Sequence, residues 1–264
     1  MMDEVVYTDE QMKTLTQTDA EIECLVETWK KAAHKEDASV ILDAYEMAKK
    51  AHSKQLRATG ELYLVHPVAA TKILFGLGLV DEYTLAAALL HDTVEDTDLT
   101  LEDIKEHLGQ EVADLVDGVT KLSRISYSSK EEMQAQNFRK MFLAMAKDIR
   151  VVLIKLADRL HNMRTMQYKE PEKQLATARE TLDIYAPLAA RLGIHRIKWE
   201  LEDLSFRYLD PDAYYELVGM LSQRRSDREE YLKEISVELA EKVAAMGIEA
   251  DIEGRPKHFY SIYR

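Results

Sequence analysis

Apolar residues recur at intervals of three and four along most of the 264-residue chain, a spacing that places them on one face of an α-helix. Only nine glycines and five prolines interrupt the pattern, so short loops are expected between the helices. The pattern predicts an all-α helical bundle. Its expected helices cover residues 19–34, 38–54, 66–78, 81–95, 110–122, 129–146, 148–168 and 171–192.

The chain changes character after residue 192. An amphipathic segment begins at Ile197, and a strongly charged helical run extends from Arg224 to Met246. We interpret residues 196–246 as a helical connector between a first domain, 1–195, and a second. Residues 247–254 alternate apolar and polar side chains, which predicts a β-strand. A short α/β segment is therefore expected at 247–264.

Two local signals mark helix boundaries. Thr100 is an expected N-cap, because its hydroxyl can accept a hydrogen bond from the acidic turn that begins with Glu102 and Asp103. Residues 57–63 interrupt the helical pattern around Gly60. They predict a loop immediately before His66.

Composition limits the class of protein. Hydrophobic residues make up 46% of the chain and charged residues 31%, as in ordinary soluble globular proteins. No apolar run approaches the ~20 residues that span a bilayer, and the acidic N-terminus lacks the apolar core of a secretory signal. We expect a cytoplasmic protein with no membrane association.

Charge and cysteine content limit the ligands. Cys24 is the only cysteine, which excludes an intramolecular disulfide and a zinc site built on paired thiolates. A net charge of -13 argues against broad nucleic-acid binding, which requires a basic surface. A small polyanion could still bind where arginines and lysines cluster.

The string HDTVEDT follows the apolar run 85–90 and carries the candidate chemistry. If residues 81–95 form one helix, His91 and Glu95 share one face, and Asp92 and Asp96 share the neighbouring face. A lone His-Asp pair is usually a surface ion pair. Four polar groups beside an apolar run are costly to bury unless a metal or hydrogen bonds satisfy them. The string favours a metal-dependent phosphohydrolase.

Asp158 is a second candidate ligand, since it follows the apolar stretch 151–157. A carboxylate in that position needs a partner, which could be a cation or a salt bridge to Arg159 or Arg150. His161 lies three residues further on. We place His161 outside the metal ligands, as a residue that could orient one of them.

The chain resembles the bifunctional Rel/SpoT alarmone enzymes of the HD phosphohydrolase superfamily. The strings that carry the resemblance are, in chain order, AHSKQLRATGELYLVHP, LLHDTVEDT, GVTKL, IKLADRLHNMRT, YAPLAARLGI and GRPKHFYSIYR. The resemblance implies an HD-type hydrolase domain at 1–195 that removes the 3′-pyrophosphate of guanosine tetra- and pentaphosphate with one manganese ion. Composition alone does not choose manganese over iron or zinc.

The same resemblance implies roles for nine residues. The implied metal ligands are His66, His91, Asp92 and Asp158. The implied catalytic carboxylates, which handle protons at the attacking water and the leaving pyrophosphate, are Glu95 and Asp96. The implied nucleotide contacts are Arg57, Asn162 and Thr165. Ala58 stands where the family has a basic residue, so one expected phosphate contact is missing; the charge could come instead from Lys54, Lys121, Lys155 or Arg159.

Residues 247–264 resemble the opening of the family's synthetase domain, whose metal-binding acidic residue and guanine loop lie further on. We therefore expect this chain not to transfer pyrophosphate from ATP to GDP or GTP. Two alternatives to the alarmone hydrolase remain. Ala58 would suit an HD phosphohydrolase of another nucleotide, and the helices of 195–246 would suit a noncatalytic nucleotide-sensing module. The oligomeric state and the preference between tetra- and pentaphosphate stay open.

Overall fold

The computed structural model describes residues 7–57, 59–123, 147–222, 225–250, 252 and 257–264. The helix expected at 129–146, and Ala58, lie outside the described residues. The longer helices are α1 (Asp9–Ala33), α2 (Ser39–Ala51), α3 (Val65–Gly76), α4 (Glu82–Leu90), α6 (Leu101–Leu108), α7 (Gln110–Ser123), α9 (Ile149–Arg164), α10 (Pro171–Glu180), α12 (His195–Leu209), α13 (Pro211–Ser222) and α14 (Arg225–Ala245). The short ones are α5 (Thr93–Asp96), the 3₁₀ turn η1 (Met166–Tyr168), the π-helical turn η2 (Thr181–Tyr185), α11 (Ala186–Arg191) and α15 (Phe259–Tyr263).

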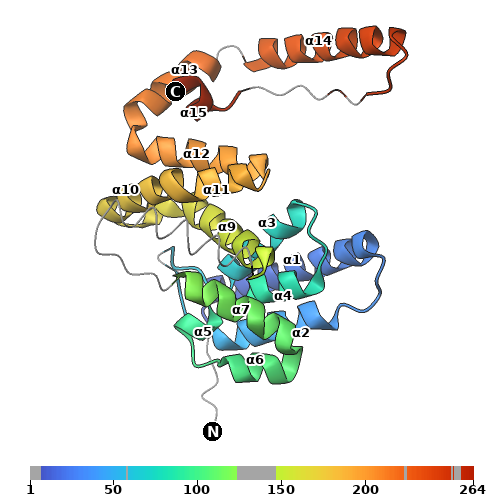
Figure 1. Cartoon of the computed structure of the whole chain (residues 1–264). Coiled ribbons are helices and arrows are strands. Elements are labelled where there is room, and N and C mark those ends of the chain that lie inside the picture. Colours follow the sequence, from blue (N-terminus) through green and yellow to red (C-terminus); the bar gives the residue numbers. More distant parts are fainter. Residues whose placement is uncertain (1–6, 58, 124–146, 223–224, 251, 253–256) are drawn as a thin grey trace.

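Helix α4 lies at the centre of the N-terminal bundle (Figure 1). Its residues 85–90 are completely buried, as expected for a helix that is apolar all round. Helices α2, α3, α7 and α9 pack around it. Because α4 is surrounded on all sides, its C-terminal end delivers the residues that follow it to the interior of the bundle.

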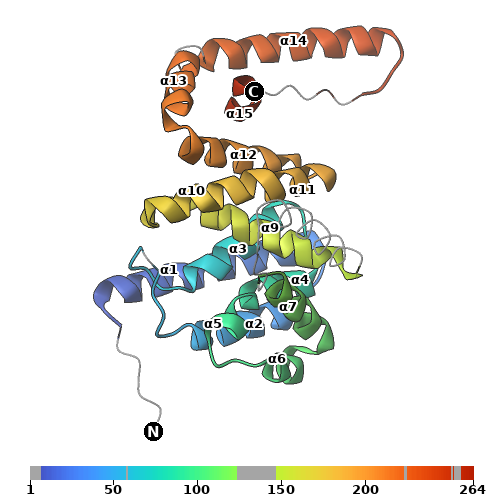
Figure 2. The same cartoon turned by 60° about the vertical axis from the view of Figure 1, so that its left-hand side comes forward.

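Helix α9 joins this bundle to the next layer. It packs against α3, α7 and α12, and α10, α11 and α12 lie on its outer side (Figure 2). The contact with α7 is close at Gly118, where an added Cβ would lie 2.7 Å from Cγ2 of Val151. The absence of a side chain at Gly118 therefore permits the approach of α7 to α9.

The helical prediction is confirmed for most of the chain, and Thr100 caps α6 through a reciprocal pair of hydrogen bonds with Asp103. The segment predicted as a helix at 171–192 contains the π-helical turn η2, in which the N–H of Ala186 donates to the carbonyl oxygen of Thr181. Pro187 follows directly and has no N–H to donate. The wider turn accommodates that missing hydrogen bond.

Two predictions were wrong. The single helix predicted at 81–95 is two helices, α4 and α5, separated by a turn at His91 and Asp92. The strand predicted at 247–254 is also wrong for its described residues, since 248–250 and 252 have no regular structure. A strand needs a neighbour to pair with, and the described part of the chain offers none beside this segment.

The C-terminal helices lie beyond α12. Helix α15 packs against α12 and α13, where the N–H of Tyr260 donates to Oδ1 of Asp203 at 2.9 Å and the Tyr263 hydroxyl donates to Asp210. Helix α14 extends away from the bundle (Figures 1 and 2). No helix in the described part of the chain combines the length and apolar character needed to cross a bilayer.

Candidate metal centre

His66 enters the site from the first turn of α3, followed by Pro67, which costs nothing there because first-turn N–H groups have no helical partner. His66 is 1% exposed. Its Nε2 lies 3.2 Å from Oδ1 of Asp158 and 3.4 Å from Oδ2 of Asp92. One ring nitrogen thus faces two carboxylates, one from the turn after α4 and one from α9.

His91 ends the central helix α4 and is equally buried. Its Nδ1 lies 2.8 Å from the carbonyl oxygen of Ala88, and a carbonyl only accepts, so Nδ1 carries a proton. Its Nε2 lies 3.2 Å from Oδ2 of Asp92 and 3.8 Å from Oδ1 of Asp158. This buried Nε2 makes no hydrogen bond within the described residues. A cation between the ring and the carboxylates would satisfy it.

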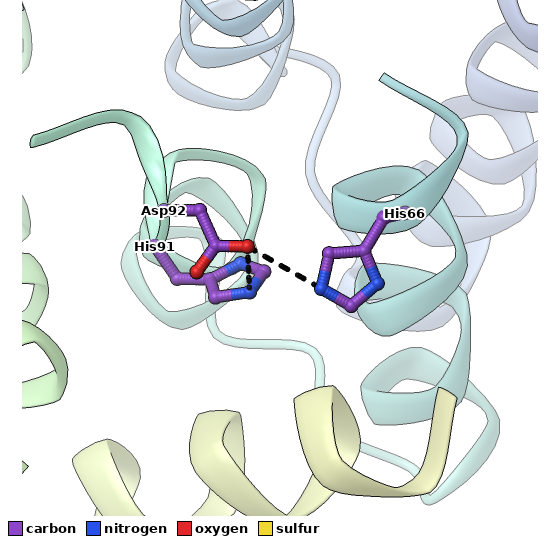
Figure 3. Close-up of side chains that lie close together, drawn as sticks. All are labelled: His66, His91 and Asp92. Atoms are coloured by element: carbon purple, nitrogen blue, oxygen red, sulfur yellow. Dashed lines mark ion pairs between the residues drawn. The ribbon is translucent and has the colours of Figure 1, made fainter. Parts of the chain in front are cut away.

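The side chains of His66, His91 and Asp92 each offer one ligand atom, and these atoms lie within 4.8 Å of one another (Figure 3). Asp158 approaches the same group on α9, at the distances to His66 and His91 given above. The structure therefore brings together all four residues that the family resemblance implies as metal ligands. Two imidazoles and two carboxylates are a donor set suited to a borderline or hard divalent ion.

The charges of the cluster favour a cation among its side chains. Burial lowers the pKa of His91, but the carboxylates of Asp92 and Asp158 outweigh it and raise that pKa to about 10. Burial likewise opposes ionisation of Asp158, yet the neighbouring Lys155 and the two histidines hold its pKa well below the usual range. Without a cation the carboxylates therefore keep a proton on the histidine. A metal ion would displace that proton.

The salt-bridge partner of Asp158 is neither of the two arginines considered from the sequence. Arg159 pairs with Glu180, and Arg150 pairs with carboxylates that include Asp148. The partner is Lys155, whose Nζ lies 2.6 Å from Oδ2 of Asp158, one turn earlier on α9. Lys155 holds one carboxylate oxygen, so Oδ1 is left directed at the two histidines.

The break between α4 and α5 decides where the HDTVEDT side chains lie. His91 and Asp92 sit in the turn, so the shared helical faces predicted for the four residues do not occur. Asp96 reaches the cluster through a tyrosine: the Tyr63 hydroxyl lies 2.7 Å from Oδ2 of Asp92 and 3.2 Å from Oδ2 of Asp96. Glu95 is exposed beside Asp96 on α5. Asp96 therefore lies at the solvent side of the buried cluster, and Glu95 is the exposed residue next to it.

A polar cavity of about 260 Å³ adjoins the cluster, and its lining includes Arg57, Tyr63, Asn162, Thr165 and Lys169. Nη2 of Arg57 donates to Oδ1 of Asn162 and to Oγ1 of Thr165, both at 3.3 Å. Asn162 also donates through Nδ2 to Oδ1 of Asp158. The three residues predicted to contact a nucleotide thus line one cavity, and Asn162 connects that cavity to the candidate metal ligands.

Residues 44–195 match a family model described as an HD domain. The chain belongs to the HD domain family. Residues 44–195 hold every site residue predicted from the sequence.

Relatives of this HD protein extend the likeness. It is 54% identical over 225 residues to a Synechocystis protein called probable guanosine-3′,5′-bis(diphosphate) 3′-pyrophosphohydrolase, covering 85% of this chain and 30% of that protein. It is 53% identical to a GTP pyrophosphokinase of Myxococcus xanthus, over 86% of this chain and 30% of that one. It is 50% identical to the bifunctional (p)ppGpp synthase/hydrolase SpoT of Escherichia coli K12, over 83% of this chain and 31% of that one. These relatives confirm the Rel/SpoT resemblance, and the chain spans about a third of their length.

Sequence reasoning missed two residues of the HD domain site. Tyr63 lies three residues before His66, in the loop that the sequence predicted, and its phenol keeps its proton because burial and then Asp92 raise its pKa. Lys169 follows η1 and lines the polar cavity, whereas Lys121, considered from the sequence, is exposed and pairs with Asp117. A tyrosine close before a candidate ligand is a signal that could have identified Tyr63. No such signal identifies Lys169, because its place at the cavity depends on the course of the chain after α9.

Proposed function

We propose that this chain hydrolyses the 3′-pyrophosphate of guanosine tetra- and pentaphosphate, yielding pyrophosphate with GDP or GTP. The observation that carries the proposal is the hydrogen-bonded connection from cavity to cluster, in which Asn162 bonds to Arg57 on one side and to Asp158 on the other. A nucleotide in the cavity would have its phosphates beside the candidate metal ligands. The printed functions of the relatives supply the substrate class.

We assign His66, His91, Asp92 and Asp158 to one divalent cation, and manganese is the ion that the Rel/SpoT resemblance favours. The buried Nε2 of His91, which has no hydrogen bond within the described residues, supports the fit of such an ion. When bound, a divalent cation acts as a Lewis acid toward a phosphoryl oxygen and acidifies water. Lys155 pairs with the Asp158 oxygen that is turned away from the histidines, and the Tyr63 hydroxyl donates to the Asp92 oxygen that faces them.

Glu95 and Asp96 are the proposed proton-transfer groups. Hydrolysis adds water to phosphorus and breaks a phosphorus–oxygen bond, so one proton must leave the water and one must reach the departing oxygen. Two carboxylates on the short helix α5, one of them linked to the cluster through Tyr63, could carry out both transfers. Asp96 is oriented by the Tyr63 hydroxyl, which lies 3.2 Å from its Oδ2.

Arg57 is the proposed guanine contact. Its guanidinium is held at both terminal nitrogens by side chains of α9 and the residue after it, which fixes the plane against which a base can stack. Asn162 and Thr165 line the same cavity, and Lys169 adds a cationic group for phosphate. This local basic group opposes the acidic charge of the whole chain.

A nucleotide panel tests the substrate. Manganese-loaded protein would be given guanosine tetraphosphate, guanosine pentaphosphate, GTP and the adenosine analogue of the tetraphosphate, with products separated by anion-exchange chromatography. Guanosine tetra- and pentaphosphate should be converted to GDP and GTP with pyrophosphate. Arg57→Gln should raise the KM for these substrates, and Arg179→Gln, on an exposed part of α10, should not.

Two results would contradict the proposal. A clear preference for another nucleotide would make the chain an HD phosphohydrolase of different specificity. Tight binding of guanosine tetraphosphate by folded, manganese-loaded protein without turnover would make it a noncatalytic nucleotide-sensing module.

A further inference from the structure

The imidazole of His161 lies between the four candidate metal ligands and the polar cavity, which is here called the nucleotide cavity. Its Nδ1 is 2.7 Å from Nδ1 of His66 and 3.2 Å from Nη1 of Arg57. Both histidine rings are buried, with exposed fractions of 8% for His161 and 1% for His66. His161 thus touches one candidate metal ligand and one candidate nucleotide contact with a single atom.

The protons at this junction follow from donor and acceptor chemistry. A guanidinium can only donate, so the contact with Arg57 requires Nδ1 of His161 to accept and to carry no proton. The 2.7 Å contact between the two Nδ1 atoms then requires the proton to lie on His66. His161 shares its Nδ1 lone pair between the two N–H groups, and its own ring proton lies on Nε2.

This arrangement determines which nitrogen of His66 is available to a cation. With the proton on Nδ1, the lone pair of neutral His66 is on Nε2, the atom that faces Asp92 and Asp158. Metal-binding histidines generally have their second nitrogen held in this way, and the hydrogen bond fixes both the tautomer and the ring orientation. The acceptor is usually a carboxylate or a carbonyl. Here it is another imidazole, which also holds Arg57.

We propose that His161 is a positioning residue that directs Nε2 of His66 at the cation and at the same time holds Arg57 in the nucleotide cavity. The inference rests on the proposed roles of His66 and Arg57 in hydrolysis. It assigns His161 no metal contact, because its Nδ1 is occupied by hydrogen bonds from His66 and Arg57 rather than directed at the carboxylates. Its removal should therefore weaken metal binding and nucleotide binding together.

Two variants of His161 separate a hydrogen-bonding role from a packing role. His161→Asn keeps an acceptor near the position of Nδ1, whereas His161→Leu fills a similar volume without one. Manganese affinity would be measured by calorimetry in the absence of nucleotide, and KM and kcat with guanosine tetraphosphate. His161→Leu should weaken manganese binding about 10–100-fold and raise KM. His161→Asn should restore most of both values.

A measurement on the unmodified protein makes the test independent of how the variants fold. Nitrogen-15 spectra of the histidine rings in metal-free protein should show His161 protonated at Nε2 only and His66 protonated at Nδ1. A proton on Nδ1 of His161 would overturn the proposal. Manganese affinity and KM unchanged in His161→Leu, or equal losses in the Asn and Leu variants, would also overturn it.

These outcomes are distinct from a failure of the proposed function. Unmodified protein that neither binds manganese nor hydrolyses guanosine tetraphosphate would refute the function. An active enzyme whose His161→Leu variant behaves like the unmodified protein would refute only the positioning role.

Discussion

Nε2 of His66 lies 3.2 Å from Oδ1 of Asp158, although the two residues belong to helices far apart in the sequence. Helices α3 and α9 pack side by side, and the end of α4 adds His91 and Asp92 at the same point. The interior of the helical bundle thus holds a set of charged and polar groups that apolar packing alone would not stabilise. The first predictions concern how those groups depend on one another.

Asp158→Asn should destabilise the metal-free protein by about 3–5 kcal/mol, because it removes the carboxylate charge that pairs with the buried ammonium of Lys155. Adding Lys155→Met should recover part of that loss, since the uncompensated charge is removed. Urea unfolding in the presence of chelator measures both effects. Manganese binding should stay weak in the single and the double variant. A double variant no more stable than Asp158→Asn would contradict the proposed pairing.

Tyr63→Phe removes the hydroxyl that donates to Asp92 but keeps the ring that stacks on His52 at a centroid distance of 4.7 Å. We expect manganese affinity or kcat to fall about 10–100-fold, as when other groups that support metal ligands are lost. The free energy of unfolding should change by only about 1 kcal/mol. Tyr208→Phe, on α12, is the matched control. Equal activity of Tyr63→Phe and the control would exclude a role for the hydroxyl.

Manganese binding should strengthen as pH rises. The carboxylates raise the pKa of His91 to about 10, so below that pH the metal-free ring carries an extra proton that the cation must displace. Between about pH 6 and 8 the apparent affinity should therefore increase with pH, with protons released on binding. Calorimetry in two buffers of different ionisation enthalpy measures the release. Affinity that does not change with pH would show that His91 is already neutral.

Gly118→Ala should destabilise the protein by about 1–3 kcal/mol by overpacking, although alanine favours helices by about 1 kcal/mol over glycine. The new Cβ would lie 2.7 Å from Cγ2 of Val151, which is buried. Adding Val151→Ala should relieve that contact, so that the two substitutions are not additive. Gly219→Ala, where an added Cβ meets nothing within 4 Å, should be neutral or stabilising. Thermal unfolding of the unmodified protein, the three single variants and the double variant compares these effects.

The sequence predicts the helices of the bundle well because the burial of one helical face is a local, periodic signal. Helices α2, α3, α7 and α9 begin and end within a few residues of the predicted bounds. The break after α4 carries no such signal. It follows contacts made in the folded state, where His91 bonds to the carbonyl of Ala88 and Asp92 accepts from Tyr63.

The candidate site, too, was predicted only in part from the sequence. The family resemblance identified the four candidate ligands, but it did not identify the residues that form hydrogen bonds or ion pairs with them. Lys155 lies one turn before Asp158, at a spacing that permits an ion pair. From the sequence, however, Lys155 was considered only as a source of charge for phosphate. The contact between His161 and His66 joins α9 to α3. Only their packing shows which ring nitrogens meet.

The most direct test of the account is the rate of pyrophosphate release from guanosine tetraphosphate during a manganese titration of chelator-treated protein, repeated with Glu95→Ala. Release should be absent without manganese and should saturate at one ion per chain. Glu95→Ala should bind the ion and fail to turn over. Release that continues in chelator, or no release from folded, manganese-bound protein, would contradict a metal-dependent alarmone hydrolase.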